Sequence, residues 1–389
     1  SLKITSLIIA IPSLDNQSRK NLIKKISKYY KNISILPPKE QIINKSITIN
    51  DLRDVNFSDI LDRNTSKLNT NLIKYLDNQN VLITGGAGSI GSELVKQIYN
   101  TNSKKIILFD NNETELFRLL LNFKKQKVIP ILGDICDEEY LRSIIKKFKI
   151  DYVFHAAAYK HLSILENNFQ SAIKNNLIGT ISVLKSLNKN VKNFTLISTD
   201  KAANPISNLG ISKRLAEIFT LSWKKNKTSV VRFGNVFASR GSVLEVFLNQ
   251  LKNNHPLTVS HRLVSRYFMS IKEACNLVLQ TNSLNFKNSI YLLNMGKPIK
   301  IIKIAESLLK FFRLNEYPIK YTYLKKGEKI NEILSSSNKK FKTKHKDIFV
   351  IKEKNYSEKK VNEFFNFLIS NFEFIEKQNI QRKIKKFIN

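Results

Sequence analysis

The chain has 389 residues, 42% of them hydrophobic, and carries 65 Lys and Arg against 31 Asp and Glu, a formal net charge of +34. It is long enough for two or three domains, and the absence of any run of about twenty apolar residues excludes a predicted membrane span. The charge is mostly lysine spread along the whole chain, without a recognition helix or a distinct basic tail, so nucleic-acid binding is not expected.

The N-terminal residues 1–40 are predicted to form an α/β unit with a strand, an amphipathic helix near 16–31 and a second strand. Residues 41–80 are polar and irregular and are predicted to be a linker or docking segment. From residue 81 to 240, apolar strand segments alternate with helical ones about every 25 residues, including one long helix expected over 175–187. This alternation predicts an α/β fold, a doubly wound parallel sheet of Rossmann type with helices on both faces.

The alternation loosens after residue 240, where short strand segments at 257–261, 289–295 and 318–324 lie among helical ones. We expect residues 241–350 to form a smaller C-terminal substrate lobe, partly interleaved with the main domain, at the carboxyl edge of the sheet. Residues 351–389 are predicted to be a helical tail with the apolar sequence FFNFLISNF as its core.

Residues 81–91, VLITGGAGSIG, follow the pattern of a strand, a glycine turn and the start of a helix. Gly85 permits the sharp turn, Gly88 lets the backbone approach a diphosphate, and Gly91 lets the helix pack on the strand. A diphosphate bound there lies on the amides of a helix N-terminus. The pattern therefore predicts binding of a dinucleotide.

Acidic residues after the next two strands refine this prediction. Asp110 ends the second strand about twenty residues after Gly91, where a carboxylate accepts hydrogen bonds from the adenosine ribose. A carboxylate at this position disfavours a 2′-phosphate, so NAD is expected in preference to NADP. Asp134, after the third strand, is placed to meet the adenine.

Arginines are scarce, yet Arg232, Arg240, Arg262 and Arg266 fall within one short stretch. Where lysine is the default cation, an arginine indicates a need for a planar, bidentate donor, as for a diphosphate. The alternative is a surface position or pairing with a carboxylate.

The two cysteines, Cys136 and Cys275, lack partner motifs and are expected to be small core residues in a reducing compartment, the cytoplasm. No histidine pair has ligand spacing, so no metal site is expected, and His155 is expected to be structural. Because the chain begins with Ser1 instead of Met, we expect it to be a piece of a longer protein.

Longer motifs resemble the extended short-chain dehydrogenase/reductases, and within them the nucleotide-sugar 4,6-dehydratases of bacterial polysaccharide and glycan biosynthesis. The resemblance covers nearly the whole chain, and its motifs are long and ordered. The matching segments are TGGAGSIGSEL (84–94), HAAAYKH (155–161), NNLIGT (175–180), STDKAANP (198–205), SKRLAE (212–217), GNVFASRGSV (234–243), RYFMSIKEA (266–274), MGKPIKI (295–301) and KKGEKINE (325–332).

The resemblance implies roles for residues after the fifth strand of the main domain. Asp200 corresponds to the acid for the leaving C6 hydroxyl, Lys201 to the base at C5, and Thr199 to a residue that hydrogen-bonds the C4 oxygen. Lys213 corresponds to the lysine that holds the nicotinamide ribose and adds positive charge near C4. An exposed ion pair on a loop is the structural alternative for Asp200 and Lys201.

The resemblance also implies which residues surround the ligands. The NAD site would include Gly85, Gly88, Ser89, Ile90, Gly91, Asp110, Asp134, Ile135, Ala156, Ala157, Ala158, Asn176 and Lys213. Asn235, Arg240, Arg266 and Glu328 match positions near the substrate's nucleotide. Lys160 and His161 are candidate substrate contacts, with a satisfied structural histidine as the alternative for His161.

One residue departs from the superfamily pattern. Leu209 occupies the position of the tyrosine in the Tyr-x-x-x-Lys motif that ends at Lys213, and leucine cannot take a proton. The membrane-anchored dehydratase branch also lacks that tyrosine, so the departure favours this branch. The C4 proton must then go to Asp200 or to a water molecule, and a damaged site is the alternative.

The sequence thus leads to one working hypothesis, a UDP-N-acetylhexosamine 4,6-dehydratase that acts on UDP-GlcNAc with NAD and retains the configuration at C5. We expect a homo-oligomer and, at full length, an anchor to the cytoplasmic face of the membrane. The alternatives are a C5-inverting dehydratase, a nucleotide-sugar 4-epimerase and a catalytically silent NAD-binding protein.

Overall fold

The computed structural model describes most of the chain from residue 69 onward and parts of the N-terminal region. The described residues are 6–9, 11, 14, 16–30, 32–35, 53–54, 69–124, 126–237, 239–312, 314, 316–335, 340–352, 356–371 and 377–388. Most of the linker expected at 41–80 lies outside the described residues, which resume at 69 with a 3₁₀ helix, η2 (Thr70–Leu76).

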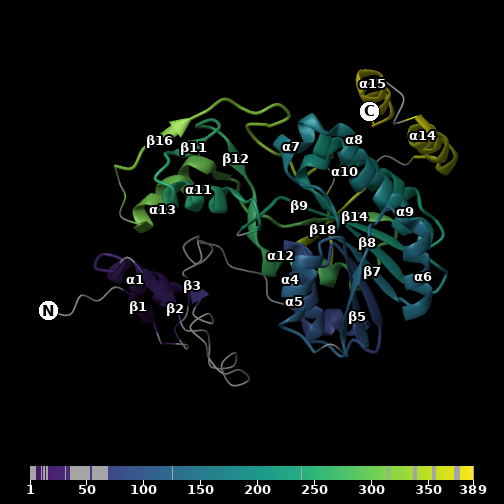
Figure 1. Cartoon of the computed structure of the whole chain (residues 1–389), viewed down its shortest axis with the longest axis horizontal. Coiled ribbons are helices and arrows are strands. Elements are labelled where there is room, and N and C mark those ends of the chain that lie inside the picture. The colour runs from purple at the N-terminus through teal and green to yellow at the C-terminus, as the bar shows by residue number, and fades with distance from the viewer. Residues whose placement is uncertain are drawn as a thin grey trace.

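A nine-stranded sheet forms the main domain, in the order β17-β18-β14-β9-β8-β7-β4-β5-β6 (Figure 1). Neighbouring strands from β14 to β6 are parallel, whereas β18 is antiparallel to both β14 and β17. The strands are β4 (Asn80–Thr84), β5 (Lys105–Asp110), β6 (Val128–Leu132), β7 (Tyr152–His155), β8 (Asn193–Thr199), β9 (Thr228–Phe233), β14 (Ser289–Leu293), β17 (Lys340–Lys342) and β18 (Ile348–Ile351). The predicted α/β fold with a mostly parallel sheet is confirmed.

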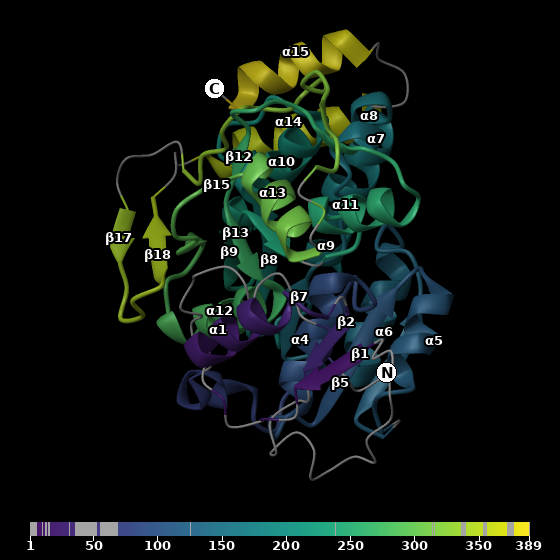
Figure 2. The same ribbon diagram turned by 90° about the vertical axis from the view of Figure 1, so that its left-hand side faces the viewer.

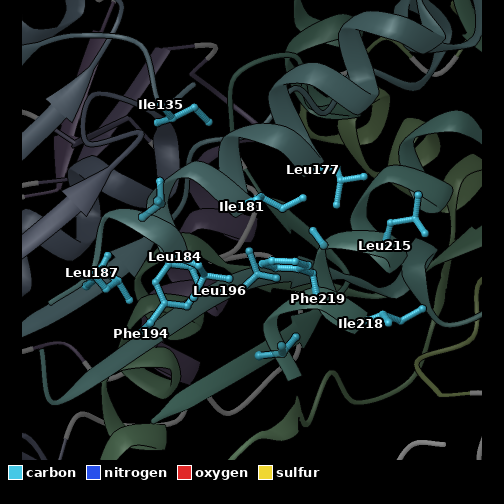
Figure 3. Close-up of a cluster of buried hydrophobic side chains, with 14 of the residues drawn as sticks. Ile135, Leu177, Ile181, Leu184, Leu187, Phe194, Leu196, Leu215, Ile218 and Phe219 are labelled. Atoms are coloured by element: carbon cyan, nitrogen blue, oxygen red, sulfur yellow. The ribbon is translucent and has the colours of Figure 1, made fainter. Parts of the chain in front are cut away.

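Helices cover both faces of this sheet. They are α4 (Ser89–Tyr99), α5 (Glu113–Leu120) and α12 (Ile271–Thr281) on one face, and α6 (Glu138–Phe148), α9 (Gly179–Ser186) and α10 (Asn208–Ser222) on the other. Strand side chains alternate between the two cores, so that Val81 and Ile83 pack on the first face and Leu82 on the second. Figure 3 shows part of the second core, where Phe194 of β8 lies near Leu184 of α9.

The long helix predicted over 175–187 is present, but its first part is π-helical instead of α-helical. Helical backbone begins with α7 (Leu162–Asn167) and α8 (Phe169–Ala172), then passes through a π-helical segment, η3 (Ile173–Ile178), before α9. Within the π turn, the side chain of Asn176 bonds the backbone of Tyr159 in both directions, at 2.8 and 3.0 Å. π turns are common at functional sites, and this one fixes the loop after β7.

A second lobe is formed by two chain segments, one that begins after the carboxyl end of β9 and one that begins after the carboxyl end of β14 (Figure 1). Because both segments begin at the same edge of a parallel sheet, the lobe lies at the carboxyl edge. Its own core contains Phe237 and Phe268, whose rings stack with centroids 4.4 Å apart. Its elements are β10 (Asn235–Phe237), α11 (Val243–Lys252), β11 (Leu257–Val259), β12 (Ser265–Arg266), β13 (Phe268–Ser270), β15 (Ile299–Lys300), α13 (Ile301–Phe312) and β16 (Ile319–Tyr321).

The strand segment at 289–295, expected among the lobe's elements, supplies β14 to the main sheet, and β18 also belongs there. The interleaving of the two parts therefore extends beyond residue 340. The domain limits at residues 40, 80, 240 and 350 stay predictions.

The two ends of the chain form small additional units. Near the N-terminus, β1 (Ser6–Ile9), α1 (Asn16–Ile26), β2 (Asn32–Ile35) and β3 (Arg53–Asp54) build a three-stranded sheet with one helix. The C-terminal tail forms two helices, α14 (Glu358–Asn371) and α15 (Lys377–Ile388), shown in yellow beside α10 in Figure 2. Phe365 of α14 meets Phe219 of α10 edge to face. Among the helices that the structure describes, none is long and apolar enough to cross a membrane.

Candidate active site

The glycine turn after β4 is shaped by close backbone contacts. Gly85 has a φ of +67°, and a Cβ atom there would lie 2.5 Å from the amide nitrogen of Ala157. A Cβ atom at Gly91 would lie 2.1 Å from the carbonyl oxygen of Gly85. Gly88 is the N-cap of α4, and no described side chain caps that helix end. The turn therefore has the backbone cradle and the helix N-terminus that a dinucleotide diphosphate requires.

A cavity of about 210 Å³ opens beside this turn at the carboxyl edge of the sheet. Predicted cofactor residues that line it are Gly85, Gly88, Asp110, Ile135, Ala156, Ala157 and Ala158. Sequence reasoning did not single out the other lining residues, which are Ala87, Phe109, Asn111, Asn112, Glu115, Gly133, Tyr159 and Asn175. Asn111, Asn112 and Gly133 directly follow β5 and β6, and that position was the signal that could have found these three.

The carboxylate of Asp110 is held at the cavity wall by two backbone amides. Its Oδ2 accepts from Ala87 at 2.9 Å and its Oδ1 accepts from Asn112 at 3.0 Å. The carboxylate is therefore fixed in orientation and half-buried at the position expected for a ribose contact.

Other predicted cofactor residues lie around the cavity without lining it. Asp134 is exposed, and its Oδ1 accepts from the amide of Cys136. Ser89 accepts a hydrogen bond from the amide of Arg240, and Ile90 and Gly91 lie in the first turn of α4. The side chain of Asn176 is engaged with Tyr159 and with Ser212.

Thr199, Asp200 and Lys201 lie at the carboxyl end of β8, where the strand passes into a short 3₁₀ turn, η4 (Asp200–Ala202). Oδ1 of Asp200 accepts from the Thr199 hydroxyl at 2.9 Å and from Nζ of Lys201 at 3.0 Å. Lys201 also donates to Oδ1 of Asn235, from the second lobe, at 3.3 Å. Because Asp200 has no exposed surface, the alternative of an exposed ion pair is wrong.

The second carboxylate oxygen of Asp200 is unusual. Oδ2 is buried without a hydrogen-bond partner among the described residues. A Cβ atom at Gly234 would lie 3.1 Å from this oxygen, so the glycine leaves space beside it. Buried carboxylate oxygens normally have partners, and an unsatisfied one indicates a place for a ligand group or a proton. The pair thus offers an acid and a base in contact, next to the dinucleotide fold.

Glu332 and Lys329 lie beside Asp200 and Lys201, and neither of them was predicted from the sequence. Oε1 of Glu332 lies 3.8 Å from Nζ of Lys201, and its Oε2 lies 3.5 Å from Nζ of Lys329. Both residues belong to the segment KKGEKINE, from which only Glu328 was selected. The signal that could have found Glu332 is an acidic residue in a motif already matched.

Lys213 and Leu209 lie on α10, one turn apart. Nζ of Lys213 donates to the carbonyl oxygen of Ile197 at 2.6 Å, and burial lowers the pKa of this lysine to about 8, against the opposing charge of Glu217. Leu209 is buried and packs with Leu165 and Ala172. At the position where the superfamily has a tyrosine, this chain therefore has an apolar side chain that packs against other apolar side chains.

The four clustered arginines have separate surroundings. Arg232 is fully buried and forms a bidentate pair with Glu217, at 2.7 and 2.6 Å. The expectation that Arg232 contacts a diphosphate was therefore wrong, and the alternative, pairing with a carboxylate, is what the structure shows. Arg240 lines the cavity and is paired with Glu115 of α5. Arg262 is exposed on the lobe.

The fourth arginine, Arg266, is joined to Glu328. Nη2 of Arg266 lies 3.2 Å from Oε1 of Glu328, and Nη1 donates to the carbonyl oxygens of Ser265 and Ile330. Ser260 donates to the same Oε1 at 3.0 Å. Two predicted substrate residues, far apart in sequence, are thus brought together in the second lobe.

Lys160 and His161, the candidate substrate contacts, lie on the exposed loop before α7. Burial of its amine lowers the pKa of Lys160, and the charge of Arg240 adds to this while Glu245 opposes it. The ring of His161 packs so close to Gly241 that a Cβ atom there would lie 2.2 Å from Cε1. Both residues therefore flank the loop that carries Arg240.

His155 occupies a structural position at the end of β7, as its sequence context led us to expect. Its ring nitrogens contact the hydroxyls of Thr84 and Thr180, at 2.6 and 3.0 Å, and the ring is fully buried. Burial, helped by the charge of Lys213, lowers the pKa of His155 from 6.5 to about 3. The ring therefore stays neutral in the folded protein over the physiological range.

This neutral histidine predicts a pH-dependent stability. The unfolded chain binds a proton at this ring near pH 6.5 and the folded chain only near pH 3, so the free energy of unfolding falls as pH drops through that window. The slope from this group approaches about 1.4 kcal/mol per pH unit. Urea unfolding of the wild type and of His155→Gln between pH 7 and pH 4 measures it, and a shallower slope is expected in the variant. Equal slopes would contradict the assignment.

Neither of the two cysteines is among the candidate catalytic residues. Cys275 is buried in the core of the main domain, and burial raises the pKa of its thiol. Burial likewise raises the pKa of the Cys136 thiol to about 12, so neither is suited to be a nucleophile. Among the described residues, no group of three or more His, Cys, Asp or Glu is placed to hold a metal ion.

The glycine turn, the carboxylate after β5, the Asp200–Lys201 pair and the lysine on α10 together define an extended short-chain dehydrogenase/reductase of the nucleotide-sugar dehydratase and epimerase type. The comparisons with known proteins agree. Residues 81–353 match the model of a family described as "Polysaccharide biosynthesis protein", and the chain belongs to this family.

Three relatives show how far the similarity extends. The "Capsular polysaccharide biosynthesis protein CapD" of Staphylococcus aureus is 37% identical over 86% of this chain, and the chain spans only 58% of that relative's length. An "Uncharacterized membrane protein MJ1061" of Methanocaldococcus jannaschii is 35% identical, with 80% of this chain and 97% of the relative covered. The solved structure of Pen from Bacillus thuringiensis is 30% identical, with a TM-score of 0.67 over 73% of this chain and 90% of that one.

Proposed function

We propose that this chain catalyses the 4,6-dehydration of a UDP-N-acetylhexosamine, UDP-GlcNAc in the first instance, for the synthesis of a surface polysaccharide or glycan. The observation that carries the proposal is the buried Asp200 in contact with Lys201, at the carboxyl end of β8 and beside Asn235 of the second lobe. A dehydration needs an acid and a base close together, and a simple dehydrogenase does not need this arrangement.

NAD is the cofactor that the residues of the glycine turn and of the end of β5 suit. The backbone cradle at Gly85 and Gly91 suits a diphosphate, and the oriented carboxylate of Asp110 suits the two hydroxyls of the adenosine ribose. The same negative charge disfavours a 2′-phosphate, which supports NAD over NADP. When bound, NAD would accept a hydride from C4 of the sugar and return it to C6.

The residues of this chain move the protons. When the substrate binds, the hydroxyl of Thr199 turns away from Oδ1 of Asp200, to which it donates in the structure, and donates to the C4 oxygen instead. Oδ2 of Asp200, which has no partner among the described residues, accepts the C4 hydroxyl proton as the ketone forms. Lys201 takes the C5 proton, which the neighbouring ketone has made acidic. Asp200 then delivers its proton to the C6 hydroxyl, the C6–O bond breaks, and water leaves.

The cycle closes when hydrogen returns to C6 and Lys201 gives its proton back to C5. The product is the 4-keto-6-deoxy sugar nucleotide, and no net oxidation takes place. Return of the proton to the same face of the sugar retains the configuration at C5. In this scheme Asp200 performs the proton transfer that a tyrosine performs elsewhere in the superfamily, so Leu209 does not damage the site.

Incubation of the protein with UDP-GlcNAc tests the proposal. The product's mass should be lower by one water, and its NMR spectrum after turnover in D₂O should show deuterium at C5 with the configuration retained. An inverted C5 would favour a C5-inverting dehydratase, and an isomer of unchanged mass would favour a 4-epimerase. Cofactor binding without turnover of UDP-sugars would favour a catalytically silent protein.

A further inference from the structure

We propose that Glu332 is a positioning residue for Lys201, and that Lys329 holds Glu332 in place. The segment 325–332, which follows β16 of the second lobe, would then complete the catalytic pair of the main domain. The kinetic part of this inference rests on the proposed dehydratase function, whereas its geometric part does not.

Glu332 is a buried carboxylate directed at the catalytic lysine. It is 5% exposed, and its Oε1 lies 3.8 Å from Nζ of Lys201, on which Asp200 and Asn235 also converge. Its Oε2 has no hydrogen-bond partner among the described residues and lies 3.5 Å from Nζ of Lys329. A buried carboxylate is costly unless it is paired, so Glu332 depends on the two lysine nitrogens that lie beside it.

The segment that carries Glu332 is fastened to the loop after Asp200. Nζ of Lys329 donates to the carbonyl oxygen of Asn204, four residues after Asp200. Gly327 has a φ of +78°, and a Cβ atom there would lie 2.8 Å from Oε1 of Glu166. The backbone of Ile330 accepts from Arg266 at 3.0 Å. The main domain and the second lobe therefore both hold the segment.

The charges alternate in space as Asp200, Lys201, Glu332 and Lys329. Once Lys201 has taken the C5 proton, it is an ammonium group between two carboxylates. Glu332 stabilises that charged form and keeps Nζ in one place, so that the proton can return to C5. Without Glu332, Lys201 keeps Asp200 and Asn235 as partners but loses the second carboxylate beside its Nζ.

Glu332→Gln, which preserves the side chain's shape, is the main variant. We expect kcat for UDP-GlcNAc to fall about tenfold while KM changes less than about twofold, because an interaction made in the reacting complex is lost. Lys329→Met should give a smaller decrease and add little in the Glu332→Gln background, because Lys329 acts through Glu332. Glu306→Gln removes an exposed carboxylate of α13 and serves as the matched control.

A second measurement does not depend on turnover. Acetylation of Lys201 by acetic anhydride, followed by mass spectrometry, should be about threefold faster in Glu332→Gln than in wild type, because Nζ has lost one of the two carboxylates that hold it in place. The rate is normalised to the exposed Lys303 of α13. Glu306→Gln should acetylate Lys201 at the wild-type rate.

The outcomes separate this inference from the proposed function. Faster Lys201 acetylation in Glu332→Gln, in a protein that turns over no UDP-sugar, would sink the dehydratase proposal and leave the positioning contact standing. Unchanged acetylation, or unchanged kcat in an active enzyme, would overturn the inference. A loss of kcat that follows a lower melting temperature, with unchanged acetylation, would also overturn it, because Glu332 would then be only structural.

Discussion

Replacing Asp200 with Asn is expected to lower kcat for dehydration of UDP-GlcNAc by roughly a hundred- to ten-thousandfold, the range typical of lost acid–base catalysis. The amide keeps an oxygen that can accept from Thr199 and Lys201, but it can neither accept the C4 proton nor deliver one to the C6 hydroxyl. Because Asp200 is wholly buried, no solvent-exposed group can replace it at that place. Initial rates from chromatography of the sugar nucleotides measure the effect.

The control for this experiment is folding and cofactor binding in the same variant. Asp200→Asn should bind NAD as the wild type does, and its melting temperature should stay within a few degrees, since the substitution is nearly isosteric. Glu306→Gln should keep wild-type turnover. Wild-type turnover by Asp200→Asn would rule out Asp200 as the acid.

The substitution Gly91→Ala is expected to weaken cofactor binding strongly. Its Cβ atom would lie 2.1 Å from the carbonyl oxygen of Gly85 and 2.8 Å from Cα of Gly86, both backbone atoms of the diphosphate turn. Backbone cannot rotate away as a side chain can, so α4 or the turn must shift. Overpacking of this kind costs about 1–3 kcal/mol of unfolding free energy. Calorimetric titration with NAD should show at least about a hundredfold weaker binding, an expectation based on displacement of the turn that bears the diphosphate.

Gly296→Ala is the matched control, because Gly296 also has a positive φ of +67° but a Cβ atom there would meet nothing within 4 Å. It should lose about 1 kcal/mol of stability from backbone strain and keep its affinity for NAD. If Gly91→Ala bound NAD as tightly as Gly296→Ala, the glycine turn would not be the cofactor site.

Much of the main domain could be predicted because its signals are local. Buried parallel strands such as β5, with its apolar run IILF, have a continuous apolar pattern in the sequence, and each is followed by a helical pattern. The placement of β14 could not be predicted in this way, because SIYLL has the same pattern in a lobe or in a central sheet. The π turn in 173–178 was missed for a related reason, since hydrophobic periodicity does not reveal one extra residue in a helical turn.

In the candidate site as well, residues with local sequence signals could be predicted, whereas residues whose partners lie on distant elements could not. Gly85, Gly91 and Asp110 could be predicted because turn geometry and strand ends restrict the residue types there. Arg232 was misjudged because its partner, Glu217, lies on another element, and a buried bidentate pair has no sequence signature of its own. Glu332 was missed because its proximity to Lys201 depends on the return of the chain from the second lobe.

The fate of the hydrogen on C4 tests the central claim most directly. UDP-GlcNAc that carries deuterium at C4 should give a product that has lost one water of ordinary mass and carries the deuterium at C6, without accumulation of reduced cofactor. That result means that hydrogen is removed and returned within a single turnover. A product that keeps its deuterium at C4, that loses no water, or that forms together with one equivalent of reduced cofactor would contradict the proposed dehydration.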